Sequence, residues 1–170
     1  MSFLDRVSCR IYCPSGPWFW QRLWWNFKSK FHCLAYEAMT FPDGIAGFVY
    51  GSMIGRHNDN YILNESALDE ILEEVQMGNE TKYWTYTDRG YTSKEYIRAA
   101  YHGPNVTLFE QVCNLIMGCC RVGVEWFFGK LKSRSGVMRD LDNMKVNMTQ
   151  VDYHVKSGCL LTNTHIFIWI

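Results

Sequence analysis

Residues 82–91 read Lys-Tyr-Trp-Thr-Tyr-Thr-Asp-Arg-Gly-Tyr, and this stretch decides the fold class that the sequence predicts. Aromatic and β-branched residues dominate up to Thr87, which is typical of a short strand. Asp88 follows directly, and Gly90 interrupts the run. A strand followed by a carboxylate and a glycine often presents an acid at the edge of a sheet. The stretch therefore indicates a strand that presents Asp88 at the edge of a sheet.

Two further acids have distinct local settings. Asp5 follows Ser-Phe-Leu, which we expect to be the end of a strand, and Glu125 lies in a long helical segment. Carboxylates that converge on one point repel each other and need hard cations between them, usually Mg²⁺. Asp5, Asp88 and Glu125 together therefore suggest chemistry on phosphodiesters.

The helix that carries Glu125 has a clear start, because Thr107 and Glu110 have the spacing of a capping box. Apolar residues at steps of 3 and 4 predict the face that packs on the sheet: Val112, Leu115, Cys119, Val122 and Trp126. An adjoining face carries Asn114, Gly118, Arg121 and Glu125. Arg121 can hold Glu125 in place from there, and the alternative is an ordinary exposed ion pair.

Elsewhere the pattern predicts local elements with defined boundaries. Residues 33–40 and 45–50 form a hairpin through the turn Phe41-Pro42-Asp43-Gly44. Ser66, with Asp69, caps a helix that ends at residues 78–79, and Ser93 caps a short helix to Tyr101. Residues 51–60 are expected to form a loop. Residues 147–154 fit a strand or a helix, and residues 159–170 fit a last buried segment or an abrupt end.

Bulk composition limits the classes of protein that fit. The length of 170 residues predicts one domain with a real core. The formal net charge is zero, which counts mildly against strong autonomous DNA binding. No uninterrupted run of about 18 apolar residues occurs, so we expect no membrane span. The seven cysteines have no zinc-ribbon spacing, which favours reduced thiols.

The segment 18–31 combines four tryptophans with Arg22, Lys28 and Lys30. Interleaved basic and aromatic residues can bind nucleic acid through charge and stacking. The alternative, which we favour on sequence alone, is a loop packed on the core with solvated lysines.

Several stretches in this order resemble the DDE superfamily endonuclease domain of Harbinger-type transposases, relatives of bacterial IS5-like enzymes. The matching residues are 3–5, 41–45, 55–59, 87–91 and 121–132. The most specific stretch is the last, Arg-Val-Gly-Val-Glu-Trp-Phe-Phe-Gly-Lys-Leu-Lys. The resemblance implies an RNase H-like fold, a mixed β-sheet flanked by helices, as a single domain over residues 1–170.

The resemblance also implies a site. Asp5, Asp88 and Glu125 would be the catalytic acids and the ligands of Mg²⁺ or Mn²⁺, with Arg121 holding Glu125. Asp59 is a further candidate ligand, and a capping or loop carboxylate is an equal alternative. His57 fits a structural histidine better than a ligand, and His102 and His154 receive no role. DNA would be the substrate, and its phosphate backbone would be contacted by Lys130, Lys132 and Arg134 and by the following Arg139.

The chain departs from the family pattern at its first acid. The family favours Asp-Gly-Thr there, whereas this chain has Asp5-Arg6-Val7, and we expect Arg6 to crowd that corner. Because the chain begins just before Asp5, we also expect the N-terminal part to be missing, with the DNA-binding region of a full transposase. A separate DNA-binding protein would then be needed, and the family implies a nuclear location.

Two functions therefore compete on the sequence. One is a metal-dependent nuclease or transposase domain, and the other is a non-catalytic remnant or recruited domain that binds a protein or DNA. An unrelated small α/β enzyme stays open as a third.

Overall fold

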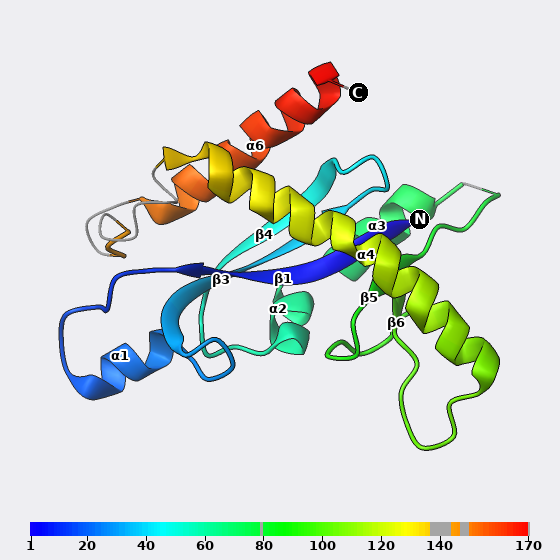
Figure 1. Cartoon of the computed structure of the whole chain (residues 1–170), viewed down its shortest axis with the longest axis horizontal. Helices are drawn as coiled ribbons and strands as arrows, with labels where there is room; N and C mark the ends of the chain where they lie inside the picture. Colours follow the sequence, from blue (N-terminus) through cyan, green and yellow to red (C-terminus); the bar gives the residue numbers. More distant parts are fainter. Residues whose placement is uncertain (79, 137–143, 147–149, 170) are drawn as a thin grey trace.

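A mixed sheet with helices on both faces forms the protein (Figure 1). The computed structural model describes residues 1–78, 80–136, 144–146 and 150–169. Along the sheet the strands run β2-β3-β1-β5-β6, and β4 pairs with β3. Their bounds are β1 Ser2–Arg10, β2 Trp25–Asn26, β3 Phe31–Thr40, β4 Ala46–Ile54, β5 Thr85–Thr87 and β6 Ile97–Ala99.

Strand β1 lies inside the sheet. It pairs antiparallel with β3, where Asp5 lies opposite Ala38, and parallel with β5. This mixed pairing, with helices on either side, confirms the predicted fold class. Asp5, however, lies in the middle of β1 and not at its end, because β1 continues to Arg10 along β3.

The predicted hairpin is present as β3 and β4, and β4 extends to Ile54. Its turn closes with Phe41 N–H donating to Ile45 O at 2.9 Å and Gly44 N–H donating to Phe41 O at 2.9 Å. Gly44 has φ 86°, a conformation that glycine adopts without strain. The turn residues in the sequence therefore fixed the pairing of β3 and β4.

The two faces of the sheet bury separate clusters. One packs against α4 (Leu108–Arg134) and α6 (Val151–Trp169), and the other packs against α2 (Asp59–Glu65) and α3 (Leu68–Gln76). Phe3 belongs to the first cluster and Leu4 to the second. Successive side chains of a strand point to opposite faces. Asp5 therefore points to the α4 face, and Arg6 points to the face of α2 and α3.

Helix α4 begins as predicted, with the capping box of Thr107 and Glu110 present. The predicted packing stripe is wrong, because Leu115 and Trp126 are 70% and 69% exposed. The buried residues are Val124, Phe127, Phe128 and Leu131. Apolar residues occur on more than one face of this helix, so periodicity alone does not select the packed face.

Helix α4 also bears on the question of a membrane. By length and mean hydropathy alone, Leu108–Arg134 could cross one. The expectation that no segment spans a membrane therefore stays a prediction. In this fold the helix packs across β1 and beside α6 (Figure 1).

Two predicted helix starts are wrong. These are the starts at Ser66 and Ser93. In addition, α2 begins within the stretch 51–60 that was expected to be a loop, where Asn58 caps it by accepting from Tyr61 N–H. Ser66 ends that helix, and α3 begins only after Ala67. The segment after Ser93 forms β6, because pairing with β5 outweighs the local helix signal.

The aromatic segment 18–31 is not a loop packed on the core. It forms α1 (Trp18–Trp24), in which no residue is buried, followed by β2 and a turn. Trp18 and Phe19 are 70% and 60% exposed. The expectation of a loop is therefore wrong for residues 18–24, although Trp24 packs against the core and Lys28 and Lys30 are exposed as expected.

The end of the described chain is helical. Residues 151–169 form α6, which answers the choice between strand and helix for residues 151–154. Cys159 and Ile166 are buried, whereas Leu161 and Phe167 are exposed. Asn79, Arg139, residues 147–149 and Ile170 lie outside the described residues.

Candidate functional site

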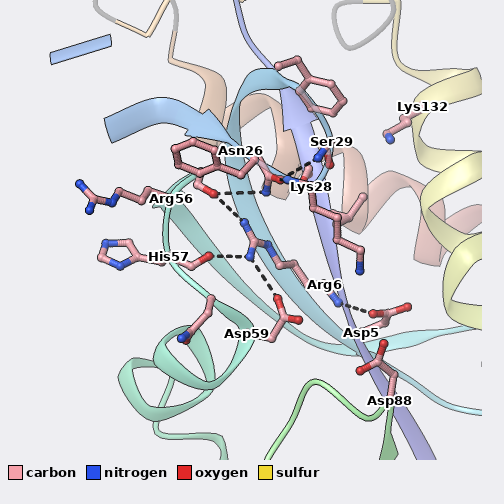
Figure 2. A pocket seen from close by; sticks show the side chains of 16 residues that line it. Asp5, Arg6, Asn26, Lys28, Ser29, Arg56, His57, Asp59, Asp88 and Lys132 are labelled. Atoms are coloured by element: carbon pink, nitrogen blue, oxygen red, sulfur yellow. Dashed lines mark hydrogen bonds and ion pairs between the residues drawn. The ribbon is translucent and has the colours of Figure 1, made fainter. Parts of the chain in front are cut away.

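The first two acids are neighbours because of the sheet register. Ser2 pairs with Thr85 and Phe3 with Tyr86 in the parallel β1–β5 ladder. Continuing this register brings Asp5 beside Asp88, just beyond the end of β5. Figure 2 shows their carboxyl groups next to each other. The expected proximity of the two acids is therefore present, although only Asp88 follows a strand end.

Asp5 is half-buried and held by two donors. Arg6 N–H donates to its Oδ1 at 2.8 Å, and Arg121 Nη1 donates to its Oδ2. Burial raises the pKa of Asp5, the Arg121 charge lowers it, and the charges of Asp88 and Glu125 raise it again. The net shift is upward. The three acids therefore interact electrostatically, and burial is the largest cause of the shift at Asp5.

Arg121 joins the first and third acids. Its Nη2 lies 3.6 Å from Glu125 Oε1, the expected contact across one helical turn. Its second contact, to Asp5, connects residues 116 positions apart and has no signal in local spacing. The guanidinium thus lies between Asp5 and Glu125, while Glu125 itself stays largely exposed.

Carboxylate oxygens are the donors that Mg²⁺ and Mn²⁺ prefer, so the residue types fit a hard cation. The arrangement fits less closely, because within the part of the chain that the structure describes no three His, Cys, Asp or Glu side chains form a group ready to hold a metal. Arg121 supplies positive charge at Asp5 and Glu125 instead. The assignment of the three acids as metal ligands stays a prediction.

Arg6 does not crowd the first acid, contrary to the expectation. Its side chain leaves β1 on the opposite face and clamps the loop before α2. It donates to His57 O at 2.6 Å, Gly55 O at 3.0 Å and Asp59 Oδ1 at 3.1 Å (Figure 2). Arg6 therefore holds the loop before α2 and the first residue of that helix, Asp59, in place.

Asp59 has features of both of its predicted roles. It lies in the first turn of α2 and is paired with Arg6, as a loop carboxylate would be. Its other oxygen faces the Asp88 loop, because a Cβ added at Gly90 would lie 3.0 Å from both Asp59 Oδ2 and Asp88 Oδ1. Because Gly90 has no side chain, the carboxylates of Asp59 and Asp88 can both lie close to its Cα.

Asn60 is a site residue that the sequence reading missed. Its Nδ2 donates to Gly90 O at 3.1 Å, and its Oδ1 accepts from Thr92 N–H at 2.6 Å. These bonds fix the loop that follows Asp88 against the start of α2. His57 also fits a structural role, because its ring stacks on Tyr61 with centroids 4.0 Å apart, and burial and the Arg6 charge lower its pKa.

Behind the acids lies Glu37, which is 0% exposed and was also missed. It faces Arg6 across the β1–β3 ladder. Burial raises its pKa to about 7, partly offset by the nearby hydroxyls of Tyr91 and Ser66. Neither carboxylate oxygen has a well-formed hydrogen bond to a residue that the structure describes. A buried acid in a strand gives no distinctive sequence signal.

A cleft of about 540 Å³ opens above Asp5 and Asp88. Its walls are the turn 26–31, the loop 55–59 and Lys132 of α4. Among the predicted DNA-contacting residues that the structure describes, Lys132 reaches this cleft. Lys130 is exposed elsewhere on α4, and Arg134 lines a different pocket between α4 and α6.

Comparison with known proteins agrees with this geometry at the level of the family. The sequence model described as DDE superfamily endonuclease matches residues 8–163. The chain belongs to the DDE superfamily endonuclease family. Asp88 and Glu125 lie within the match, and Asp5 lies just before it. Neither the search of curated proteins nor that of solved structures found a match.

Proposed function

We propose that this domain is a metal-dependent DNA endonuclease of the Harbinger-type, IS5-like group, with Asp5, Asp88 and Glu125 as its catalytic acids. The observation that carries the proposal is the parallel β1–β5 register, which places Asp5 beside Asp88 in the inner part of the sheet. Arg121 brings Glu125 to the same neighbourhood. Nuclear location and a separate DNA-binding partner belong to this proposal as well.

In this proposal Asp5, Asp88 and Arg121 have separate roles. Asp5 is oriented by Arg6 N–H, and Asp88 is oriented by Gly90 N–H. Bound Mg²⁺ or Mn²⁺ would acidify water and offset charge that builds up on the phosphate oxygens. Hydrolysis forms a bond from water oxygen to phosphorus and breaks a phosphorus–oxygen bond, and the departing oxygen takes a proton. Arg121, which contacts both Asp5 and Glu125, can steady one of them when a cation binds the other.

A second function has its own supporting observation. Arg121 already contacts two of the acids, as a permanent substitute for a cation would. In that case the domain is a non-catalytic, transposase-derived fold that binds DNA or a protein. The two functions differ in whether the acids take up a metal.

The test compares thermal melting with and without Mn²⁺, beside plasmid nicking, for the wild type and Asp88→Asn. The matched control is Asp69→Asn, because Asp69 is an acid on α3 that forms an ion pair with Lys94. For the nuclease, Mn²⁺ at about 100 times its Kd adds about 2.7 kcal/mol of stability, and Asp88→Asn loses both this gain and nicking. If Mn²⁺ leaves the melting temperature of all three proteins unchanged, the result would favour the non-catalytic function.

A further inference from the structure

The turn 26–31 forms one wall of the cleft above the acids, and hydrogen bonds hold its backbone in place. Asn26 is buried, and its Oδ1 accepts from Lys28 N–H and Ser29 N–H, each at 2.9 Å. Its Nδ2 donates to Gly55 O at 3.2 Å, which ties the turn to the opposite loop. The backbone of the turn is therefore fixed while Phe27, at its tip, stays 54% exposed.

The loop on the other side of the cleft is tied to α1. Arg56 N–H donates to Leu23 O at 3.2 Å. A Cβ at Gly55 would lie 2.5 Å from Trp24 O and 2.7 Å from Cys33 O, so this close approach requires glycine. The C-terminal end of α1 thus packs against the loop that forms this wall of the cleft.

The charges around the cleft are unevenly compensated. Arg6 is paired with Asp59, and Asp5 with Arg121. Lys28, Arg56 and Lys132 also line the cleft, and none forms an ion pair with another residue that the structure describes. Figure 2 shows Arg56 on one side and Lys132 on the other. Three basic side chains without an ion pair among the described residues therefore line the same cleft as Asp5 and Asp88.

We propose that this cleft binds an unpaired stretch of single-stranded DNA, one or two nucleotides long within the cleft. Phe27 stacks on a base, and Lys28, Arg56 and Lys132 contact the flanking phosphates. Aromatic stacking combined with a basic groove is how proteins hold unpaired strands. The volume of about 540 Å³ lies in the range of roughly 300–1,000 Å³ typical of small-molecule sites, which matches one or two nucleotides inside the cleft.

This inference names the form of the substrate for the proposed nuclease, but the binding it describes does not require catalysis. The experiment measures fluorescence anisotropy of a labelled 12-nucleotide oligo-dT in EDTA, with a duplex and an oligo-rU of equal length as competitors. Phe27→Ala is paired with Phe109→Ala, an exposed aromatic on α4 outside the cleft. Lys132→Ala is paired with Lys82→Ala, an exposed lysine outside the cleft.

We expect oligo-dT to bind more tightly than either competitor. Phe27→Ala should weaken binding about tenfold, since losing one stacked base costs about 1–3 kcal/mol. Lys132→Ala should reduce the slope of log affinity against log salt by about 0.7, the value for one phosphate contact to a single strand. Both controls should bind as the wild type, and unchanged melting temperatures would show that all four variants are folded.

The failures of the two proposals are distinguishable. Selective binding of oligo-dT that depends on Phe27 and Lys132, together with a melting temperature that Mn²⁺ does not change, would support the cleft and refute the nuclease. Nicking with equal affinity for duplex and oligo-dT would support the nuclease and overturn the cleft inference. Tighter binding of oligo-rU, or equal losses in Phe27→Ala and Phe109→Ala, would also overturn it.

Discussion

Replacing Glu37 by glutamine should make the protein more stable at neutral and alkaline pH. Glu37 is fully buried on the inner strand β3, with its carboxylate oxygens poorly hydrogen-bonded among the described residues. The groups that face it are the hydroxyls of Tyr91 and Ser66, the Asp59 carboxylate and the Lys94 ammonium. Glutamine keeps the shape of the protonated acid and removes its charge.

The magnitude follows from the pKa of Glu37, which burial raises from 4.5 to about 7. Between these two pH values the unfolded chain releases a proton that the folded protein retains. The free energy of unfolding therefore falls as pH rises through this window. At about 1.4 kcal/mol for each pH unit, the folded protein loses about 3 kcal/mol between pH 4.5 and 8.

The assay is urea unfolding of the wild type and Glu37→Gln at pH 5 and pH 8, with Glu70→Gln on the exposed face of α3 as control. Other titrating groups, such as Asp5, are common to both proteins and cancel in the difference. We expect Glu37→Gln to gain about 3 kcal/mol relative to the wild type on moving from pH 5 to pH 8. An equal difference at both pH values would refute the reasoning, because Glu37 would then be ionised in the folded protein at no cost.

Two further predictions concern α4. Leu131→Ala should lower the free energy of unfolding in urea by about 2–5 kcal/mol, whereas Leu115→Ala should change it by no more than about 0.5 kcal/mol, because only Leu131 is buried. A larger loss for Leu115→Ala would mean that the predicted stripe packs after all. Thr107→Ala should cost about 1 kcal/mol in the same assay, since Thr107 Oγ1 accepts from Glu110 N–H at 3.3 Å. No loss would show that the cap is not formed.

The sequence predicted the fold class and the features that local chemistry controls. The turn at Phe41–Gly44 and the cap at Thr107 each depend on a few adjacent residues with special backbone or hydrogen-bonding properties. Both are present in the structure. The neighbouring placement of Asp5 and Asp88 was also predicted, from two strand ends, although only Asp88 follows one.

What the sequence could not predict depends on contacts between distant residues. The face of α4 that packs was chosen wrongly because Leu115 and Leu131 both lie on apolar stripes of the helix. The segment after Ser93 became β6 because β5 was available to pair with it. Arg6 was expected to crowd the first acid, although alternation along β1 sends its side chain to the other face.

Arg121 links the two candidate functions, because any cation that binds Asp5 must compete with it. The pKa of Asp5 is raised even with the Arg121 guanidinium in contact. One positive charge therefore does not offset the burial of Asp5 and the charges of Asp88 and Glu125. A divalent cation brings twice that charge and can accept oxygens from two acids at once. We place the nuclease ahead of the non-catalytic function because Asp5, Asp88 and Glu125 are all retained and Asp5 interacts electrostatically with both of the others.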